Sequence, residues 1–194
     1  MPTVLRRALL CGLFASSIAS LGCDGRIDAP PAESAEVPDP PFVPAPAQMR
    51  RLTDTQYANV VNDVLGPVVV PSRIDPFDSI GGLQSVATSS RGYSPRGVEQ
   101  YESAAFQIAE QAMTPSEARD AWMPCDPTGT VDDACARRVL VRVTRRAWRR
   151  PADTAEVETL VRVAAHAAET VGDFHGGLAY ALSAVLQSPR LLFR

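Results

Sequence analysis

The residues of this sequence best suited to chemistry are its four cysteines and one arginine-rich run. Cys23 follows Ser20, Leu21 and Gly22, an order that resembles a bacterial lipobox, in which the cysteine thiol accepts a diacylglycerol. The usual leucine three residues before the cysteine is replaced here by Ser20. Ordinary signal-peptidase cleavage that leaves Cys23 as a thiol is therefore the alternative. We predict lipidation of Cys23, because an acidic, proline-rich segment suited to a tether follows it at once.

A second pair of cysteines, Cys125 and Cys135, remains once Cys11 is removed with the leader and Cys23 is modified. An even pair in an exported protein favours a disulfide, because oxidation is favoured outside the cytosol. Closing so short a loop contributes roughly 2–3 kcal/mol in the chain-entropy picture. A metal site is the alternative, but no histidine or further cysteine lies nearby in sequence to complete a tetrahedral set of ligands. We predict the disulfide and no metal site.

Residues 135–151 contain seven arginines, and helical spacing places four of them together on one flank. These four are Arg138, Arg142, Arg145 and Arg149. The favoured interpretation is structural, because long arginine stems cover apolar surface and pair with acids on neighbouring helices. Guanidinium groups also suit carboxylates and phosphates, so the same stripe is a candidate anion-binding site for an acidic polysaccharide or a lipid headgroup. Nucleic acid is the weakest alternative, because the chain carries a net charge of −3 and an export signal.

No catalytic or cofactor-binding pattern accompanies these residues. Neither histidine, His166 or His175, has a cysteine, acid or serine at a spacing that builds a triad or a metal site. The sequence has no Cys-x-x-Cys-His haem motif, no glycine-rich phosphate-binding motif and no His-Glu-x-x-His. Asp63, Asp75 and Asp78 are interpreted as solvated acids rather than cation ligands. We predict no catalytic residues and no cofactor.

The chain divides into four predicted parts. Residues 1–22 form a signal peptide, in which two arginines precede an apolar run shorter than the roughly 20 residues that span a bilayer. Residues 23–47 form an acidic, proline-rich linker that we expect to be disordered and extended. Helical modules follow at residues 48–123 and 124–194. The expected location is the cell envelope, with a lipid anchor as the contact with the membrane.

Both modules are predicted to be all-α, with about six helices in total, because apolar residues recur at helical spacing behind capping residues. The expected helix starts are Thr53, Ser94, Thr114, Asp132 or Asp133, Asp153 and Asp173. Residues 68–92 are expected to form a long loop with at most a short strand at 68–70. The helix that ends at Pro151 is placed centrally, because Val141 and Trp148 form a second apolar strip away from its main apolar face.

The sequence stops soon after a new helix start at Ser188 and Pro189. Leu191, Leu192 and Phe193 open a helix that does not continue. We therefore expect a truncated second module and an apolar stub that is exposed and promotes association.

Three segments occur in an order that resembles a known family: residues 50–66, 135–160 and 184–194. The family is an uncharacterised, secreted multidomain series first described in planctomycetes and common in myxobacteria. Small helical domains precede larger ones in these proteins, and some relatives carry a cytochrome c domain. Trp148 and Asn62 depart from the residues usual in the family, and the resemblance brings no established catalytic residues.

Two functional hypotheses remain from the sequence. The first is a non-enzymatic lipoprotein module that serves as an interaction or scaffold unit at the cell surface. The alternative, which follows from the resemblance, is the N-terminal part of a larger extracellular enzyme or redox protein, with downstream domains as its partners.

Overall fold

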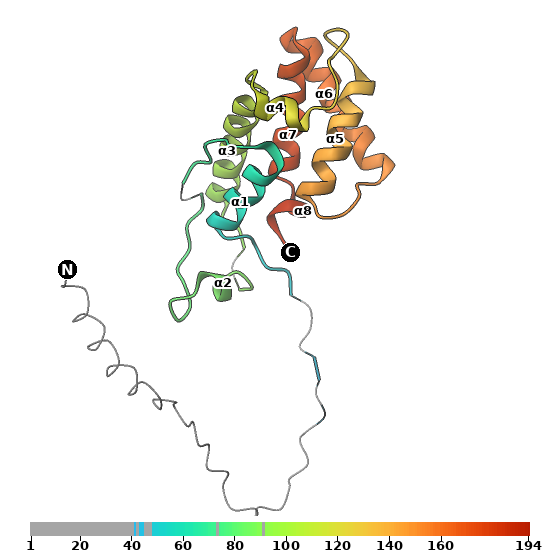
Figure 1. Ribbon diagram of the computed structural model, residues 1–194. Helices are drawn as coiled ribbons and strands as arrows, with labels where there is room; N and C mark the ends of the chain where they lie inside the picture. The colour runs from blue at the N-terminus through green and yellow to red at the C-terminus, as the bar shows by residue number, and fades with distance from the viewer. Residues whose placement is uncertain (1–40, 42, 45–47, 73, 91) are drawn as a thin grey trace, which may run out of the picture. The chain divides into compact units, whose positions relative to one another are not determined.

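The computed structural model describes residues 41, 43–44, 48–72, 74–90 and 92–194. Contacts divide the chain into Met1–Ala45 and Pro46–Arg194, and we call the second the helical unit. Among the described residues there are eight helices and no strand, which confirms the predicted all-α class (Figure 1). They are α1 (Asp54–Leu65), α2 (Gln84–Ala87), α3 (Pro95–Met113), α4 (Glu117–Trp122), α5 (Asp133–Ala147), α6 (Thr154–Val171), α7 (Phe174–Leu186) and α8 (Pro189–Leu192). No helix in this part of the chain has the length and apolar composition needed to cross a membrane.

Side-chain caps fix the starts of most helices where the sequence predicts them. Thr53 accepts a hydrogen bond from the Gln56 backbone N–H, and the Gln56 side chain accepts one from the Thr53 N–H, which completes a capping box. The same reciprocal pair joins Asp153 and Glu156 at α6. The short helix predicted from Thr114 is present as α4, but Ser116 is its N-cap, because Thr114 is the C-cap of α3.

The hydrophobic core is built around α7, which packs against α3, α5, α6 and α8. A side chain at Gly177 would overlap the Ala164 carbonyl, so glycine is what lets α6 and α7 approach so closely. Helix α5 packs against α1, α4, α6 and α7, in agreement with its predicted central place. One cluster of buried residues takes side chains from both 48–123 and 124–194, and the boundary between these two parts stays a prediction.

Helix α5 buries the predicted apolar face but ends earlier than predicted. It stops at Ala147, with Trp148 as C-cap, because Arg149 adopts a left-handed backbone conformation with φ 57°. The second apolar strip is wrong for one of its two residues: Val141 is 47% exposed, whereas Trp148 is buried. The predicted stop at Pro151 therefore lies in the turn between α5 and α6.

Two regions of the helical unit differ in part from expectation. Residues 68–70 form no strand, which agrees with the prediction of at most a short one, but the long loop contains the short helix α2, which was not predicted. The C-terminal stub is not exposed, because Leu191 and Leu192 are buried in the core. Backbone hydrogen bonds of 2.7–2.8 Å pair Arg50 and Leu52 with Arg194 and Leu192, so both ends of the helical unit lie together.

Candidate functional site

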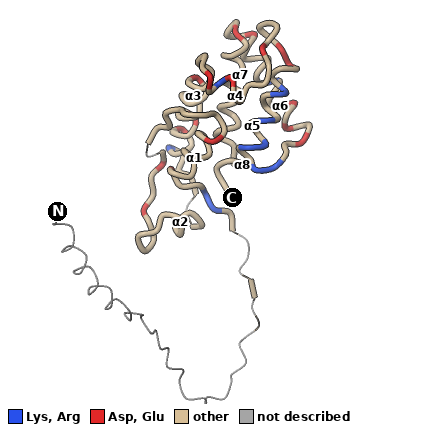
Figure 2. Tube along the Cα trace, in the orientation of Figure 1, with Lys and Arg blue, Asp and Glu red and all other residues tan. Residues whose placement is uncertain are grey.

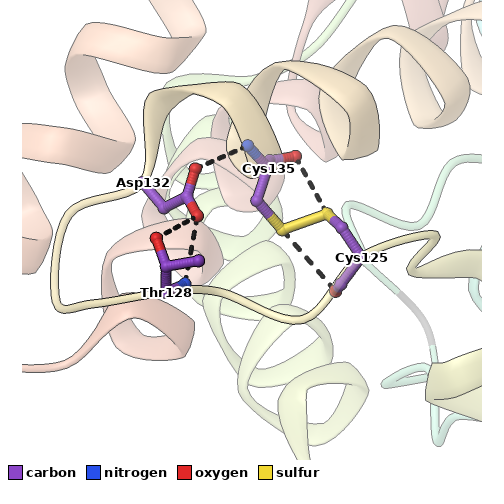
Figure 3. Close-up of a disulfide and its surroundings, with 4 residues drawn as sticks. All are labelled: Cys125, Thr128, Asp132 and Cys135. Atoms are coloured by element: carbon purple, nitrogen blue, oxygen red, sulfur yellow. Dashed lines mark hydrogen bonds between the residues drawn. A yellow bond between two sulfur atoms is a disulfide. The ribbon is translucent and has the colours of Figure 1, made fainter.

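The predicted disulfide joins Cys125 to Cys135, with their Cα atoms 5.8 Å apart (Figure 3). Asp132, the N-cap of α5, accepts from the Cys135 N–H at 2.9 Å and from the Thr128 N–H and hydroxyl at 3.1 and 2.9 Å. Hydrogen bonds from Cys135 and then Thr128 hold the pKa of Asp132 below its usual range, and the charge of Arg138 adds a smaller effect. One carboxylate thus caps the helix and orders the loop that the disulfide closes.

The arginine-rich run forms a basic surface along α5 and the turn that follows it (Figure 2). We call its predicted flank the basic stripe: Arg138, Arg142, Arg145 and Arg149. All four are exposed, and Arg138, Arg142 and Arg145 lie on α5 itself. The structure gives two of them backbone partners: Arg142 donates to the Ala121 carbonyl at 3.1 Å, and Arg149 to the Leu191 carbonyl at 3.4 Å. No carboxylate among the described residues forms an ion pair with any of the four.

The arginines outside the stripe behave differently. Arg137 forms an ion pair with Glu158 of α6. Glu156, also of α6, pairs with Arg150 at 2.7 Å and with Arg190 at the start of α8. Arg146 donates to the carbonyl of Asp63 at the end of α1. The structural interpretation therefore holds for Arg137, Arg146 and Arg150, whereas the anion-binding interpretation of the stripe stays a prediction.

A buried arginine that the sequence did not indicate lies just before α1, beside the C-terminal segment. Arg51 is 1% exposed, and its guanidinium donates to the Asp75 carboxylate at 2.9 Å and to the Asp75 and Gly92 carbonyls at 3.1 and 3.0 Å. The guanidinium carbon also lies 4.4 Å from the centre of the Phe77 ring and 4.2 Å from that of Tyr93. The charge is thus enclosed by one carboxylate and two aromatic faces, which favour a buried cation, while the buried Nε atom of Arg51 has no hydrogen-bond partner among the described residues.

Asp75 is the main partner of this arginine, which corrects its interpretation as a solvated acid. Its side chain is only 12% exposed, and it also accepts from the Ser94 hydroxyl at 2.7 Å. Its own N–H donates to the Gln100 side chain at 3.0 Å, and its φ of 48° turns the loop back toward α3. A side chain at Gly97 would overlap Asp75, so the approach of this loop requires glycine there. No local sequence pattern indicates this pair, because Arg51 and Asp75 are 24 residues apart in sequence.

We call Arg51, Asp75, Phe77 and Tyr93 the Arg51 cluster. Contacts between aromatic rings connect this cluster to the C-terminal segment. Tyr93 stacks edge-on with Tyr101 and with Phe193, and Tyr57 stacks edge-on with Tyr101. The Tyr93 hydroxyl donates to the Leu192 carbonyl at 3.1 Å. Burial, with a further contribution from neighbouring Tyr101, raises the pKa of Tyr57 and of Tyr93 well above the ordinary range. Burial likewise raises the pKa of Tyr101, although the charge of Arg51 opposes it.

The two histidines lie apart. His166 is exposed on α6, whereas His175 lines a hollow of about 440 Å³ between the end of α3, α4 and the start of α7. The His175 Nδ1 atom is 4.0 Å from an Asp173 carboxylate oxygen. Within the described residues, no three histidine, cysteine, aspartate or glutamate side chains are placed to hold a metal ion. Cys23, the predicted lipidation site, lies outside the described residues.

Two stretches of the chain match known protein families. Residues 50–114 match the family described as "PSD3: Protein of unknown function (DUF1587)", and residues 135–194 match "PSD5: Protein of unknown function (DUF1595)". The search of curated proteins and the search of solved structures returned no match. The first match contains the Arg51 end of the molecule and the second contains the basic stripe. The chain therefore carries two domains of unknown function, a DUF1587 domain followed by a DUF1595 domain.

Proposed function

We propose that this chain is an exported lipoprotein, anchored through Cys23, whose helical unit is a non-enzymatic interaction module. Its binding surface is the basic stripe, and its ligand is a carboxylate-bearing polymer such as an acidic polysaccharide. We also propose that the chain belongs to the secreted planctomycete and myxobacterial series that its sequence resembles, which agrees with an exported module.

The observation that carries the proposal is the division of the arginines into two groups. Arg137, Arg150 and Arg190 use the carboxylates of α6, and Glu156 serves two of them. The basic stripe has no carboxylate partner among the described residues, although it lies on the same helix and in the turn after it. Exposed guanidinium groups that form no ion pair within the helical unit remain available to an external anion.

The geometry of the stripe suits a repeating ligand. Arg138 and Arg145 are seven residues apart on α5, which is about 10 Å along a helix axis. Val141, 47% exposed, lies between them and offers an apolar contact for the face of a sugar ring. Arg142 uses only one of the five N–H donors of a guanidinium on the Ala121 carbonyl, so it too can bind a carboxylate. A polymer that presents one carboxylate after another would engage several arginines at once.

The binding test compares two double variants with the same change of charge. Arg138→Glu with Arg145→Glu alters the stripe, whereas Arg96→Glu with Arg162→Glu alters exposed positions on α3 and α6. We expect the stripe variant to lose at least tenfold in affinity for immobilised polygalacturonate, and the control to lose less than threefold. The affinity of the parent protein for polygalacturonate should fall steeply as the salt concentration rises. Equal losses in both variants would show a general charge effect and remove the stripe as the binding surface.

The anchor has its own test, which does not depend on the ligand. Cys23→Ser should abolish partition into the detergent phase and change the mass of the mature N-terminus. A variant that still partitions, with the N-terminal mass of the parent, would rule out lipidation at this residue.

A further inference from the structure

An apolar tip projects from the loop between α1 and α3. We define it as Ile80, Leu83 and Val86, whose side chains are 46%, 59% and 47% exposed. Aliphatic side chains this exposed are ordinary when they are scattered, but these three lie within seven consecutive residues. Figure 1 shows this loop, with α2, extending from the ends of α1 and α3 rather than lying across the bundle.

A tight turn builds the tip and holds it open. Ile80 and Leu83 exchange backbone hydrogen bonds of 3.4 and 3.0 Å, and Gly81 and Gly82 between them have φ of 58° and 80°. Positive φ at both central residues is the geometry of a type I′ hairpin turn, which glycine adopts without strain. A Cβ added to either glycine would meet no atom within 4 Å, so the turn stands in open space. The side chains of the apolar tip are therefore exposed to solvent rather than packed against the rest of the helical unit.

The base of the tip is fixed to the rest of the helical unit. Ala87 and Thr88 are buried, and the Arg51 N–H donates to the Thr88 carbonyl at 3.2 Å. Arg50 and Arg194 are exposed and exchange backbone hydrogen bonds of 2.7 and 2.8 Å. Two exposed cationic residues therefore lie next to the segment that carries the apolar tip.

The composition of the tip selects the kind of partner. Residues 79–90 contain no charged residue, so their transfer out of water does not require the desolvation of a full charge. Aliphatic side chains at an open turn, with arginines set behind them, match the two layers of a lipid interface: acyl chains first and anionic headgroups above. We propose that the apolar tip inserts into the interface of an anionic lipid bilayer, with Arg50 and Arg194 among the headgroups. This contact is separate from the Cys23 anchor and from the basic stripe.

The test places a fluorescent reporter at the tip of the full mature chain. The native tryptophans, Trp122 and Trp148, are 3% and 8% exposed, so they give a constant background. Leu83→Trp should shift its emission to the blue and be quenched by brominated lipids in vesicles that contain phosphatidylglycerol, with weaker effects in pure phosphatidylcholine. Val141→Trp, at a position 47% exposed against 59% for Leu83 and next to the basic stripe on α5, is the control and should be quenched at least threefold less.

Several outcomes would overturn the proposal. An unchanged spectrum for Leu83→Trp with both lipids would do so, and the tip would then be a surface for a protein partner. Equal or stronger quenching of Val141→Trp would assign the lipid contact to the basic stripe or to the anchor alone. Arg50→Glu combined with Arg194→Glu should abolish the preference for phosphatidylglycerol while leaving the weaker response to phosphatidylcholine. A preference that survives this change would remove the two arginines from the proposal.

Discussion

Replacing Arg51 by methionine tests whether one buried charge holds the loop between α1 and α3 against the segment that precedes α1. Methionine keeps the apolar stem of the side chain and removes the guanidinium, so the packing volume changes little. The variant loses three hydrogen bonds, to the Asp75 carboxylate and to the Asp75 and Gly92 carbonyls, as well as the contacts with two aromatic rings. The Asp75 carboxylate then keeps the Ser94 hydroxyl and N–H as its partners.

The expected loss follows from the burial of the pair. Removing one member of a buried ion pair costs about 3–5 kcal/mol, because the remaining charge stays in a poorly solvated place. The lower end applies here, since the Asp75 side chain is 12% exposed and Ser94 still donates to it. We expect a loss of about 3 kcal/mol in the free energy of unfolding, against the 5–15 kcal/mol typical of whole proteins. For a domain of this size the melting temperature should fall by roughly 6–12 °C.

Urea unfolding followed by the fluorescence of the buried tryptophans measures this loss. Arg50→Met is the matched control, because the neighbouring arginine is exposed and its replacement should change stability by less than about 0.5 kcal/mol. Asp75→Asn completes a double-mutant cycle, since asparagine tolerates the positive φ of residue 75. The double variant should lose at least about 1 kcal/mol less than the sum of the single losses. Strict additivity, or a cost below 1 kcal/mol for Arg51→Met, would refute the assigned role.

Two further predictions concern the disulfide and the tyrosines. With its ends 10 residues apart in sequence, the Cys125–Cys135 bridge should contribute roughly 2.7 kcal/mol by the loop-entropy relation; urea unfolding of the double alanine variant measures it, and a loss below 1 kcal/mol would contradict it. Because burial raises the pKa of Tyr57, Tyr93 and Tyr101 in the folded state, the unfolded chain releases their protons first as pH rises. The contribution of these tyrosines to stability should therefore be constant below about pH 10 and fall above it. Absorbance at 295 nm should show these rings ionising together with unfolding, whereas their ionisation near pH 10 in a folded protein would disprove the effect.

Helix starts could be predicted from the sequence because capping is a local interaction. Thr53 with Gln56, and Asp153 with Glu156, satisfy backbone groups only three residues away, so the sequence spacing contains the whole interaction. The disulfide was predictable for a different reason. Once Cys11 and Cys23 were assigned to the signal peptide and the lipid anchor, Cys125 and Cys135 remained as a pair.

The Arg51 cluster was not predictable, because its contacts depend on the tertiary fold. Arg51 meets Asp75 and Gly92 across 24 and 41 residues, and Tyr93 meets Leu192 across 99. No local pattern distinguishes Arg51 from its exposed neighbour Arg50. The burial of the C-terminal segment was missed for the same reason, since its partners lie at the other end of the helical unit.

The two interpretations of the arginine-rich run are compatible, and stability measurements can separate them. Stripe neighbours such as Arg138 with Arg142, and Arg142 with Arg145, stand four and three residues apart on α5, where like charges destabilise a helix by about 0.2–0.5 kcal/mol per pair. None of these arginines forms an ion pair among the described residues, although the charge of Arg138 acts favourably on the Asp132 carboxylate. The relief of this like-charge repulsion and the loss of the favourable contacts of Arg138 with Asp132 and of Arg145 with the C-terminal end of α5 oppose each other. Arg138→Glu with Arg145→Glu should therefore change the free energy of unfolding by less than about 0.5 kcal/mol while it weakens polyanion binding. Arg137→Glu places a second carboxylate beside Glu158, so it should lower the stability of the protein without weakening polyanion binding. The two measurements together distinguish the arginines that serve folding from those that serve binding within one helix.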